Sequence, residues 1–363
     1  MASLSSGKNV SGIPKYQQIL QQLRADILTG IYPAGARLPS ENALGEQFTV
    51  SRLTVQRALK ELQIENLVDR RAGSGTYAKS QPRTAGLLFG LLIPGLGETE
   101  IFEPICRGMA KAGSGGGHGL LWGEREEAGV QQAQTLCQDY ISRGVSGVFF
   151  APIEGQPDKD EANRTIVELL SRAGVPTVLL DRCFEPYPHR SQLDLVGIDN
   201  RRAGYRITAH LLKHGSKRPV FLAQVDSAPT VDARAAGFRE LVPDGPVLRL
   251  DPAGAEAIHE VLERLHPDGF VCANDITAVT LMKTLEQLGC DVPRTIRITG
   301  IDDVKYASLL RVPLTTLHQP CEAIGAGALD LMLSRIANPK LPARDLLFDC
   351  PLIIRQSCGE EPS

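Results

Sequence analysis

The sequence predicts an α/β protein in which a small domain of helices and a hairpin precedes a large body of two doubly wound lobes. With 363 residues, the chain is longer than one ordinary domain. After residue 86, short apolar runs alternate with helical stretches, which is typical of a parallel sheet covered on both faces. The residues before that point lack this alternation. We therefore expect a domain over 1–79, a linker over 80–86 and a body over 87–363.

Composition excludes several classes of protein. Hydrophobic residues make up 42% of the chain and charged residues 22%, the balance of a globular protein. No apolar run approaches the ~18 residues of a membrane span, and the N-terminal segment has no apolar core of a secretory signal. The eight cysteines form no C-x-x-C pair, so we expect reduced thiols and a cytoplasmic protein. The seven histidines show no metal-site or catalytic-triad spacing, and we expect neither a cofactor nor a bound metal.

Charge is unevenly distributed between the two parts. Residues 1–85 contain 11 Lys and Arg against 6 Asp and Glu, a net charge of +5. The remainder contains 28 against 36, a net charge of −8. A basic head on an acidic body suggests that the head meets a polyanion, although a solvated basic face without a partner is an equal alternative on charge alone.

The order of elements in the head predicts a winged helix-turn-helix. Apolar residues at helical spacing and the N-cap residues Ser40 and Ser51 predict helices over 14–29, 40–48 and 51–65, and a hairpin over 67–79 turns at Gly73-Ser74-Gly75. A third helix of this kind fits the major groove, where Arg and Gln side chains contact base edges and hydroxyls contact phosphate. Its exposed start consists of Ser51, Arg52, Thr54, Gln56 and Arg57. The wing adds Arg70 and Arg71 beside glycines that let the backbone approach a groove.

Three runs, over 35–44, 48–62 and 70–77, closely resemble the gluconate-repressor (GntR) family of bacterial regulators. The resemblance implies that residues of both helices and the wing glycines lie at the DNA: Arg37, Ser40, Glu41, Arg52, Thr54, Gln56, Arg57, Gly73 and Gly75. The residue types at the start of the third helix and in the wing add Ser51, Arg71 and Ser74 to this candidate set. Two positions depart from the family pattern. Asn66 stands where glycine is usual, and Gln56 stands where relatives often carry arginine, which leaves the base preference beneath it open.

Eight apolar runs predict the strands of the body. They cover 87–94, 119–122, 147–152, 175–181, 195–199, 218–223, 269–275 and 296–303. The glycine-rich segment 113–119 resembles a phosphate-binding loop only superficially, because it lies between a helix and a strand in the reverse order and lacks the Gly-Lys-Ser/Thr ending. We expect it to be a flexible connection.

Two longer segments, over 197–239 and 273–317, resemble the effector domain of the lactose-repressor (LacI) family, itself similar to periplasmic sugar-binding proteins. The resemblance implies two lobes joined by three crossing strands. It places the lobes at about 87–197 with 317–345, and at 198–316 with the C-terminus. A small molecule is then expected between the lobes, at the carboxyl ends of the strands.

Polar and aromatic residues near predicted strand ends are the candidates for holding that molecule. They are Phe102, Trp122, Asp181, Arg234, Asn274, Asp275 and Asp302. Carboxylates and a guanidinium suit vicinal hydroxyls, and an aromatic ring suits the apolar face of a sugar. Trp122 is equally compatible with a core position, and Asp275 and Asp303 with helix caps. A carbohydrate is favoured; a purine or a sugar phosphate stays open, although Ala228 lies where purine-type pockets carry an arginine.

The two resemblances together predict a ligand-responsive repressor that binds a pseudo-palindromic operator as a homodimer. An enzyme is the alternative of a different class. A body that uses pyridoxal phosphate would need about a hundred more residues and a suitably placed lysine. A sugar-cleaving carboxylate pair, or a sugar-binding scaffold that does not regulate, are further alternatives.

Overall fold

The computed structural model describes residues 15–28, 31–32, 35–65, 67–71, 74–79, 86–93, 100–123, 129–156, 158–185, 189–225 and 227–359. The chain divides into two compact units, the head over 1–85 and the body over 86–363. The expected linker lies outside the described residues except for Gly86, as do Asn66 and Gly73.

The head contains the predicted helices and hairpin. Helices α1 (Lys15–Leu28), α2 (Glu41–Phe48) and α3 (Arg52–Ile64) precede an antiparallel pair of strands, β1 (Val68–Arg71) and β2 (Gly75–Ala78). The hydroxyl of Ser40 accepts a hydrogen bond from the Ala43 N–H, and that of Ser51 accepts one from the Thr54 N–H. Both predicted caps are therefore confirmed. The core of the head is built from all three helices and the hairpin: Ile19, Leu23, Leu44, Val55, Leu59, Leu62 and Val68.

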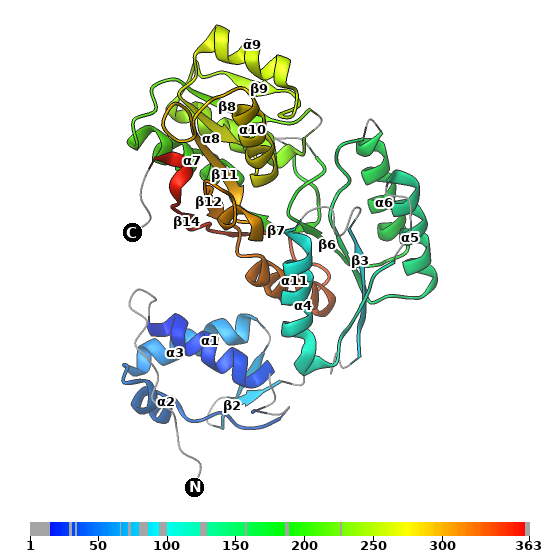
Figure 1. The fold of residues 1–363 in the computed structure, drawn as a ribbon. Helices are drawn as coiled ribbons and strands as arrows, with labels where there is room; N and C mark the ends of the chain where they lie inside the picture. Colours follow the sequence, from blue (N-terminus) through cyan, green and yellow to red (C-terminus); the bar gives the residue numbers. More distant parts are fainter. Residues whose placement is uncertain are drawn as a thin grey trace. The chain divides into compact units, whose positions relative to one another are not determined.

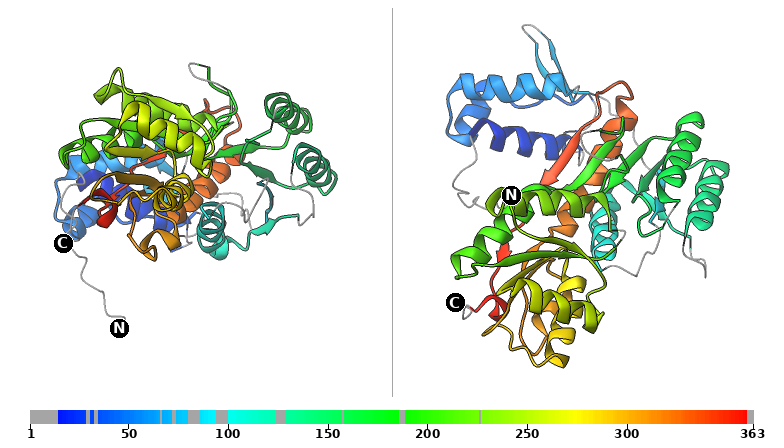
Figure 2. Two further views of the ribbon diagram at one scale, coloured as in Figure 1. Left: turned by 45° about the horizontal axis from the view of Figure 1, so that its top comes forward. Right: turned by 90° about the horizontal axis from the view of Figure 1, so that it is seen from above.

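The amino lobe of the body is a parallel sheet with helices on both faces. Its strand order is β13-β7-β6-β5-β3-β4. Helices α4 and α11 cover one face, and α5 and α6 cover the other (Figure 2). The elements are β3 (Leu88–Leu92), α4 (Phe102–Gly113), β4 (Gly119–Leu121), α5 (Val130–Ser142), β5 (Gly147–Phe150), α6 (Lys159–Arg172), β6 (Thr177–Leu180), β7 (Asp194–Ile198), α11 (Cys321–Ala337) and β13 (Asp345–Phe348).

The carboxyl lobe repeats this architecture with the order β14-β12-β11-β10-β8-β9, in which only β14 runs antiparallel (Figure 1). Helices α7 and α8 cover one face and α10, with α9 beside it, the other. The elements are α7 (Asn200–Lys213), β8 (Pro219–Ala223), α8 (Pro229–Leu241), β9 (Val247–Arg249), α9 (Ala255–Leu265), β10 (Gly269–Cys272), α10 (Asp275–Gln287), β11 (Arg297–Asp302), the 3-10 turn η2 (Lys305–Ser308), β12 (Thr315–His318), β14 (Leu352–Ile353) and the 3-10 turn η3 (Gln356–Cys358).

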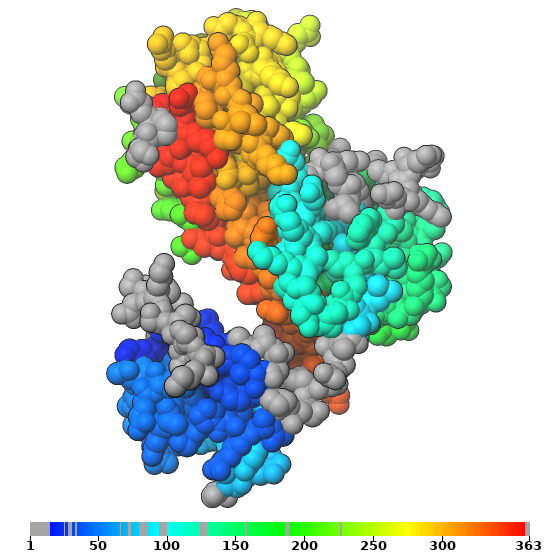
Figure 3. All heavy atoms as spheres, turned by 60° about the horizontal axis from the view of Figure 1, so that its bottom comes forward, coloured from blue at the N-terminus to red at the C-terminus, as the bar shows by residue number. Residues whose placement is uncertain are grey.

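The chain crosses between the lobes three times, as predicted. The crossings follow β7, β12 and β13. After the last one, β14 and η3 lie along β12 and β11, visible as a red band beside orange atoms in Figure 3. Each lobe is thus completed by a segment from late in the chain.

Four strands of the body escaped the sequence prediction. Strands β9, β13 and β14 are short and partly exposed, and β12, although buried, has the sequence Thr-Thr-Leu-His and is therefore not a continuous apolar run. The glycine-rich segment expected as a flexible connection contains one turn of 3-10 helix, η1 (Ser114–Gly116), and turns into β4 at Gly117, whose φ is +67°.

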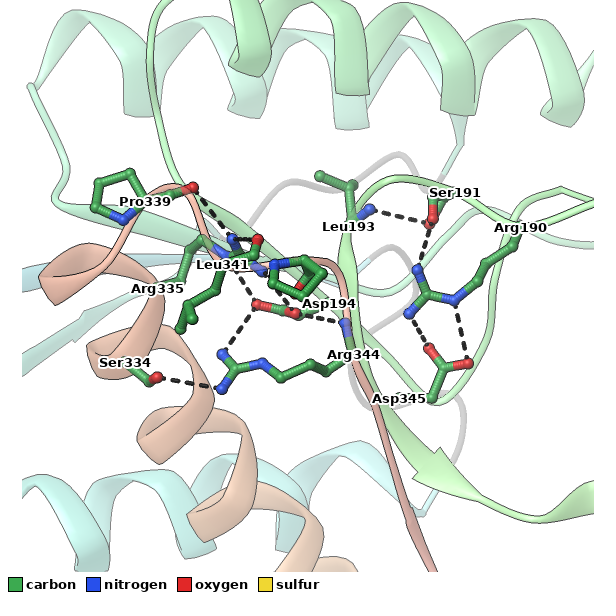
Figure 4. A network of polar contacts seen from close by, with 11 residues as sticks. Arg190, Ser191, Leu193, Asp194, Ser334, Arg335, Pro339, Leu341, Arg344 and Asp345 are labelled. Atoms are coloured by element: carbon green, nitrogen blue, oxygen red, sulfur yellow. Dashed lines mark hydrogen bonds and ion pairs between the residues drawn. The ribbon is translucent and has the colours of Figure 1, made fainter. Parts of the chain in front are cut away.

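A buried ionic network fixes the segment between α11 and β13 (Figure 4). Asp194, the first residue of β7, accepts hydrogen bonds from Nε and Nη2 of Arg335, each over 2.9 Å, and from the backbone N–H of Arg344 over 2.8 Å. Burial opposes ionisation, but these donors hold the pKa of the Asp194 carboxyl below its usual value. Arg190 adds a two-pronged pair with Asp345 at the start of β13.

Candidate DNA-binding surface and ligand site

Glu41 on α2 holds three side chains of the predicted DNA-binding surface. Its carboxylate accepts hydrogen bonds from Nε of Arg52 over 2.8 Å and from Nε2 of Gln56 over 2.9 Å, both on α3. It also accepts one from Nη2 of Arg70 on β1, over 2.6 Å. The bond from Arg52 holds the pKa of the Glu41 carboxyl below its usual value despite some burial. We call Glu41, Arg52, Gln56 and Arg70 the Glu41 clamp; it joins α2, the start of α3 and the wing.

The Glu41 clamp changes the roles expected of two residues. Both carboxylate oxygens of Glu41 are occupied by donors of the head itself. Gln56 uses an amide N–H on Glu41, so the two-pronged contact of a glutamine with adenine requires that this bond be exchanged. Arg52 is bonded through Nε and keeps its side chain 67% exposed. The Arg52 side chain is therefore exposed to solvent, whereas the Gln56 amide is held against α2 by its hydrogen bond to Glu41.

The wing is arranged around Tyr77. The guanidinium of Arg71 lies 4.8 Å from the centre of the Tyr77 ring and pairs with Asp69. The Ser74 hydroxyl and the Tyr77 hydroxyl are 2.8 Å apart. Gly75 has a φ of +127°, and a β-carbon there would lie 2.8 Å from Nε of Arg37. Arg37 can therefore lie this close to the wing only because residue 75 is a glycine.

Several predicted ligand residues meet where the two lobes of the body join. Asp181 follows β6, Asp302 ends β11, and Arg234 lies on α8. Asp181 and Asp302 have φ values of +66° and +132°, and Asp303 has +57°. Non-glycine residues rarely adopt such conformations, and strain of this kind gathers at ligand sites.

Arg234 is buried and contacts three elements. Its Nε donates to the side-chain oxygen of Asn200 over 2.8 Å, and its Nη1 donates to the carbonyl of Ala273 over 2.6 Å. Its Nη2 lies 3.7 Å from Oδ1 of Asp302. A β-carbon at Gly204 on α7 would collide with the backbone carbonyl of Arg234, so glycine there permits the helix contact that places this side chain.

Asp302 is held at the crossing between β12 and α11. Nε2 of Gln319 donates to Oδ1 of Asp302 over 2.6 Å, and the Gln319 backbone N–H donates to the Asp302 carbonyl. Burial raises the pKa of Asp302 to about 7, Arg234 opposes the rise, and the charges of Asp275 and Asp181 add to it. Since Asp181 belongs to the amino lobe, carboxylates of both lobes act on each other here.

Arg182 completes this group from the amino lobe. It is 7% exposed, donates through Nε to the carbonyl of Pro152, and pairs through Nη1 with Asp181 and with Glu154. We name the group the junction cluster; it comprises Asp181, Arg182, Asn200, Arg234, Asp302 and Gln319. The sequence interpretation missed Arg182, Asn200 and Gln319, although Arg182 directly follows a candidate and Gln319 directly follows a strand.

Asn274 and Asp275 both make hydrogen bonds within their own lobe. The side-chain oxygen of Asn274 accepts from the N–H and the hydroxyl of Thr277 and caps α10. Asp275 is completely buried and accepts from the Thr316 hydroxyl over 2.6 Å and from the Val304 N–H over 3.0 Å. The alternative that Asp275 caps its helix is wrong, because Asn274 is the cap. Both carboxylate oxygens of Asp275 are engaged within the carboxyl lobe, and a ligand contact there stays a prediction.

Asp303 was likewise expected to cap a helix, and this is also wrong. Its oxygens lie 2.6 Å from Nη2 of Arg355 and 3.0 Å from Nδ1 of His318. The turn that follows, η2, has Val304 at its N-cap position and no side-chain cap.

The two aromatic candidates differ in exposure. Phe102 is 1% exposed in the core of the amino lobe, with the guanidinium of Arg182 5.7 Å from its ring centre. Burial leaves this ring no open face for a sugar. Trp122 is 56% exposed after the edge strand β4, so the alternative of a core position is wrong.

Neither a metal site nor a membrane-spanning helix is found among the residues that the structure describes. No group of three or more His, Cys, Asp or Glu side chains has the arrangement of a metal site among them. None of their helices is both long and apolar enough to cross a membrane.

Comparison with known proteins agrees with this geometry. Residues 15–78 match the family described as bacterial regulatory proteins, gntR family, and residues 208–358 match the periplasmic binding protein-like domain. The arabinose metabolism transcriptional repressor of Geobacillus stearothermophilus is 26% identical over 367 residues, covering 96% of this chain and 98% of that protein.

Solved structures show the same fold in the body. The transcription regulator GntR from Chromobacterium violaceum has a TM-score of 0.59 and 26% identity, covering 76% of this chain and all of that one. A LacI-family transcriptional regulator from Enterococcus faecalis V583, solved with bound ribose, has a TM-score of 0.63 and 23% identity, covering 74% and 98%.

A winged head that presents a helix, together with a two-lobed body that gathers polar groups between its lobes, defines a ligand-responsive transcriptional regulator. The chain joins a DNA-binding domain that matches the gntR family to an effector domain that matches the periplasmic binding protein-like domain and shares its two-lobed fold with the solved structures. Both resemblances expected from the sequence are confirmed.

Proposed function

We propose that this chain represses transcription in the cytoplasm by binding a pseudo-palindromic operator as a homodimer, and that a sugar bound at the junction cluster modulates this binding. We assign DNA binding to the head over 1–79, and sugar binding and dimerisation to the body over 87–363. The linker over 80–86 joins the two. The observation that carries the proposal is that Asp181 from one lobe and Arg234 with Asp302 from the other meet at the carboxyl ends of both sheets.

Charge in and around the junction cluster favours a neutral sugar. The two guanidiniums, of Arg182 and Arg234, are already engaged by carboxylates and main-chain carbonyls. Four carboxylates, of Glu154, Asp181, Asp275 and Asp302, surround them. An added phosphate or carboxylate would meet net negative charge, whereas hydroxyl groups donate to carboxylates at no such cost. The pentoses named for the similar proteins, arabinose and ribose, are of this kind.

We infer binding without turnover at this site. The Asp302 carboxylate accepts from Gln319, and the Asp181 carboxylate is paired with Arg182. Neither is left as an uncommitted acid or base beside a reacting bond. The similar proteins named above are regulators, which supports the same interpretation.

Thermal unfolding of the full chain tests the ligand class. Arabinose, ribose and other neutral sugars are compared with their phosphates and sugar acids. A ligand at 100 times its dissociation constant adds about 2.7 kcal/mol to the stability of the native state. Stabilisation by a neutral sugar, which is recovered unchanged after incubation, supports the proposal. Stabilisation by phosphates alone, or consumption of the sugar, contradicts it.

A further inference from the structure

Leu53 is exposed on α3, the helix that is expected to enter the major groove. Its relative exposure is 77%, against 69% for Ile64 at the other end of α3. Val55, Leu59 and Leu62 on the same helix are completely buried in the head. At 3.6 residues per turn, Leu53 lies about 160° around the helix from Val55, so its side chain points away from the core. Leu53 therefore contributes nothing to the packing of the head.

The neighbours of Leu53 are polar and held in place. Glu41 draws Arg52 and Gln56 toward α2. Arg57 lies over the ring of Tyr16, 4.0 Å from its centre. Leu53 stands between these side chains in the first turn of α3, beside the paired hydroxyls of Ser51 and Thr54. Leu53 is thus an apolar side chain among polar and basic ones in the first turn of α3.

A duplex offers one kind of apolar group that carries sequence information in the major groove, the 5-methyl group of thymine. A protein partner would call for an apolar patch, whereas the immediate neighbours of Leu53 on α3 are charged and hydroxyl side chains. The basic surroundings favour the nucleic acid.

We propose that Leu53 is a specificity-determining residue that contacts the 5-methyl group of a thymine in each half-site of the operator. This inference rests on the proposed DNA binding of the head. It assigns to an apolar contact part of the specificity that the sequence interpretation gave to Gln56, whose amide is engaged by Glu41.

The test uses a duplex that the full-length protein selects from a random double-stranded library. Each thymine of that duplex is replaced singly by deoxyuridine, which removes the methyl group and keeps the pairing. Affinities are measured by fluorescence anisotropy at one salt concentration. We expect about a fourfold loss of affinity at one thymine of each half-site, the equivalent of one buried methyl group. Leu53→Ala should bind the thymine duplex about that much more weakly and should not distinguish thymine from uracil there.

Ile64→Ala is the matched control, because Ile64 is nearly as exposed on the same helix but lies in its last turn. It should keep the wild-type preference for thymine. Equal binding of every uracil duplex by the wild type, or an unchanged preference in Leu53→Ala, would overturn the inference while leaving the proposed function intact. Failure to enrich any duplex would overturn both.

Discussion

The carboxylate of Glu100 in the amino lobe accepts a hydrogen bond from the backbone N–H of Lys305 in the carboxyl lobe, across 3.1 Å. Glu100 lies shortly before α4, and Lys305 begins the η2 turn that follows Asp302. Burial raises the pKa of Tyr306 to about 12, and the Glu100 charge adds to the rise. The lobes are thus linked beside the junction cluster by a contact separate from the three crossings.

Glu100→Ala should weaken sugar binding about three- to tenfold, the value of one typical hydrogen bond of about 0.5–1.5 kcal/mol, if the linked arrangement is the one that binds. Trp122 is the sole tryptophan of the chain and lies exposed at a strand end of the amino lobe, so its fluorescence can follow the titration. Glu103→Ala, an exposed change in the first turn of α4, is the control. Equal affinities for the wild type and both variants would show that the contact has no role in binding.

Glu41→Ala should reduce operator affinity about tenfold or more, although it removes a negative charge from a surface that meets DNA. The reason is that Arg52, Gln56 and Arg70 lose their common acceptor. Glu46→Ala removes a charge from the exposed side of the same helix and should leave affinity equal or slightly higher. Fluorescence anisotropy titrations of labelled operator DNA with each variant measure these affinities. A gain in affinity for Glu41→Ala would mean that the Glu41 clamp does not position these side chains.

Arg234→Met should destabilise the body by about 3 kcal/mol and abolish stabilisation by the sugar. It leaves a buried carbonyl, the Asn200 side chain and the Asp302 carboxylate without their cation. Arg239→Met, on the exposed side of α8, should change neither property. Denaturant unfolding with and without sugar measures both effects. If the variant is as stable as the wild type and is still stabilised by the sugar, Arg234 is needed neither for the stability of the body nor for sugar binding.

Acidification from pH 7 to pH 5 should raise the stability of the body through Asp302. Burial raises its folded pKa to about 7, above the usual value of 3.8, so the folded state keeps a proton that the unfolded state has lost. The stability contributed by the protonated form is therefore lost as pH rises from about 4 to about 7. Asp302→Asn should flatten this dependence in unfolding experiments, while the Gln319 amide keeps an oxygen to donate to. An equally steep dependence in the variant would place the responsible group elsewhere.

Local signals made the head predictable. Ser40 and Ser51 satisfy N–H groups of their own helices, and the apolar spacing of α3 is set within one helix. The strands β5 and β6 at the centre of the amino-lobe sheet were equally predictable from the sequence, because strands buried on both faces are continuous apolar runs.

The chemistry of the sites depends on contacts between distant segments, and there the sequence was less informative. Glu41 is distinguished from Glu46 by side-chain donors that lie 11, 15 and 29 positions away, on α3 and on the wing. Asp275 and Asp302 both follow apolar strands, yet a hydroxyl 41 positions away occupies the first and a crossing segment holds the second. No local pattern separates a carboxylate enclosed by its own lobe from one that faces the other.

The three crossings have a consequence for synthesis. The amino lobe is begun by β3 but lacks α11 and β13 until residue 348 has been made. At about 5–20 residues per second, the ribosome takes roughly 8–30 s to travel from the end of β7 to the end of β13. During that interval the unpaired edge of β7 and the face that α11 will cover are open to other nascent chains. The carboxyl lobe can assemble most of its strands meanwhile, so the part of the body made first is completed by one of the last segments to emerge.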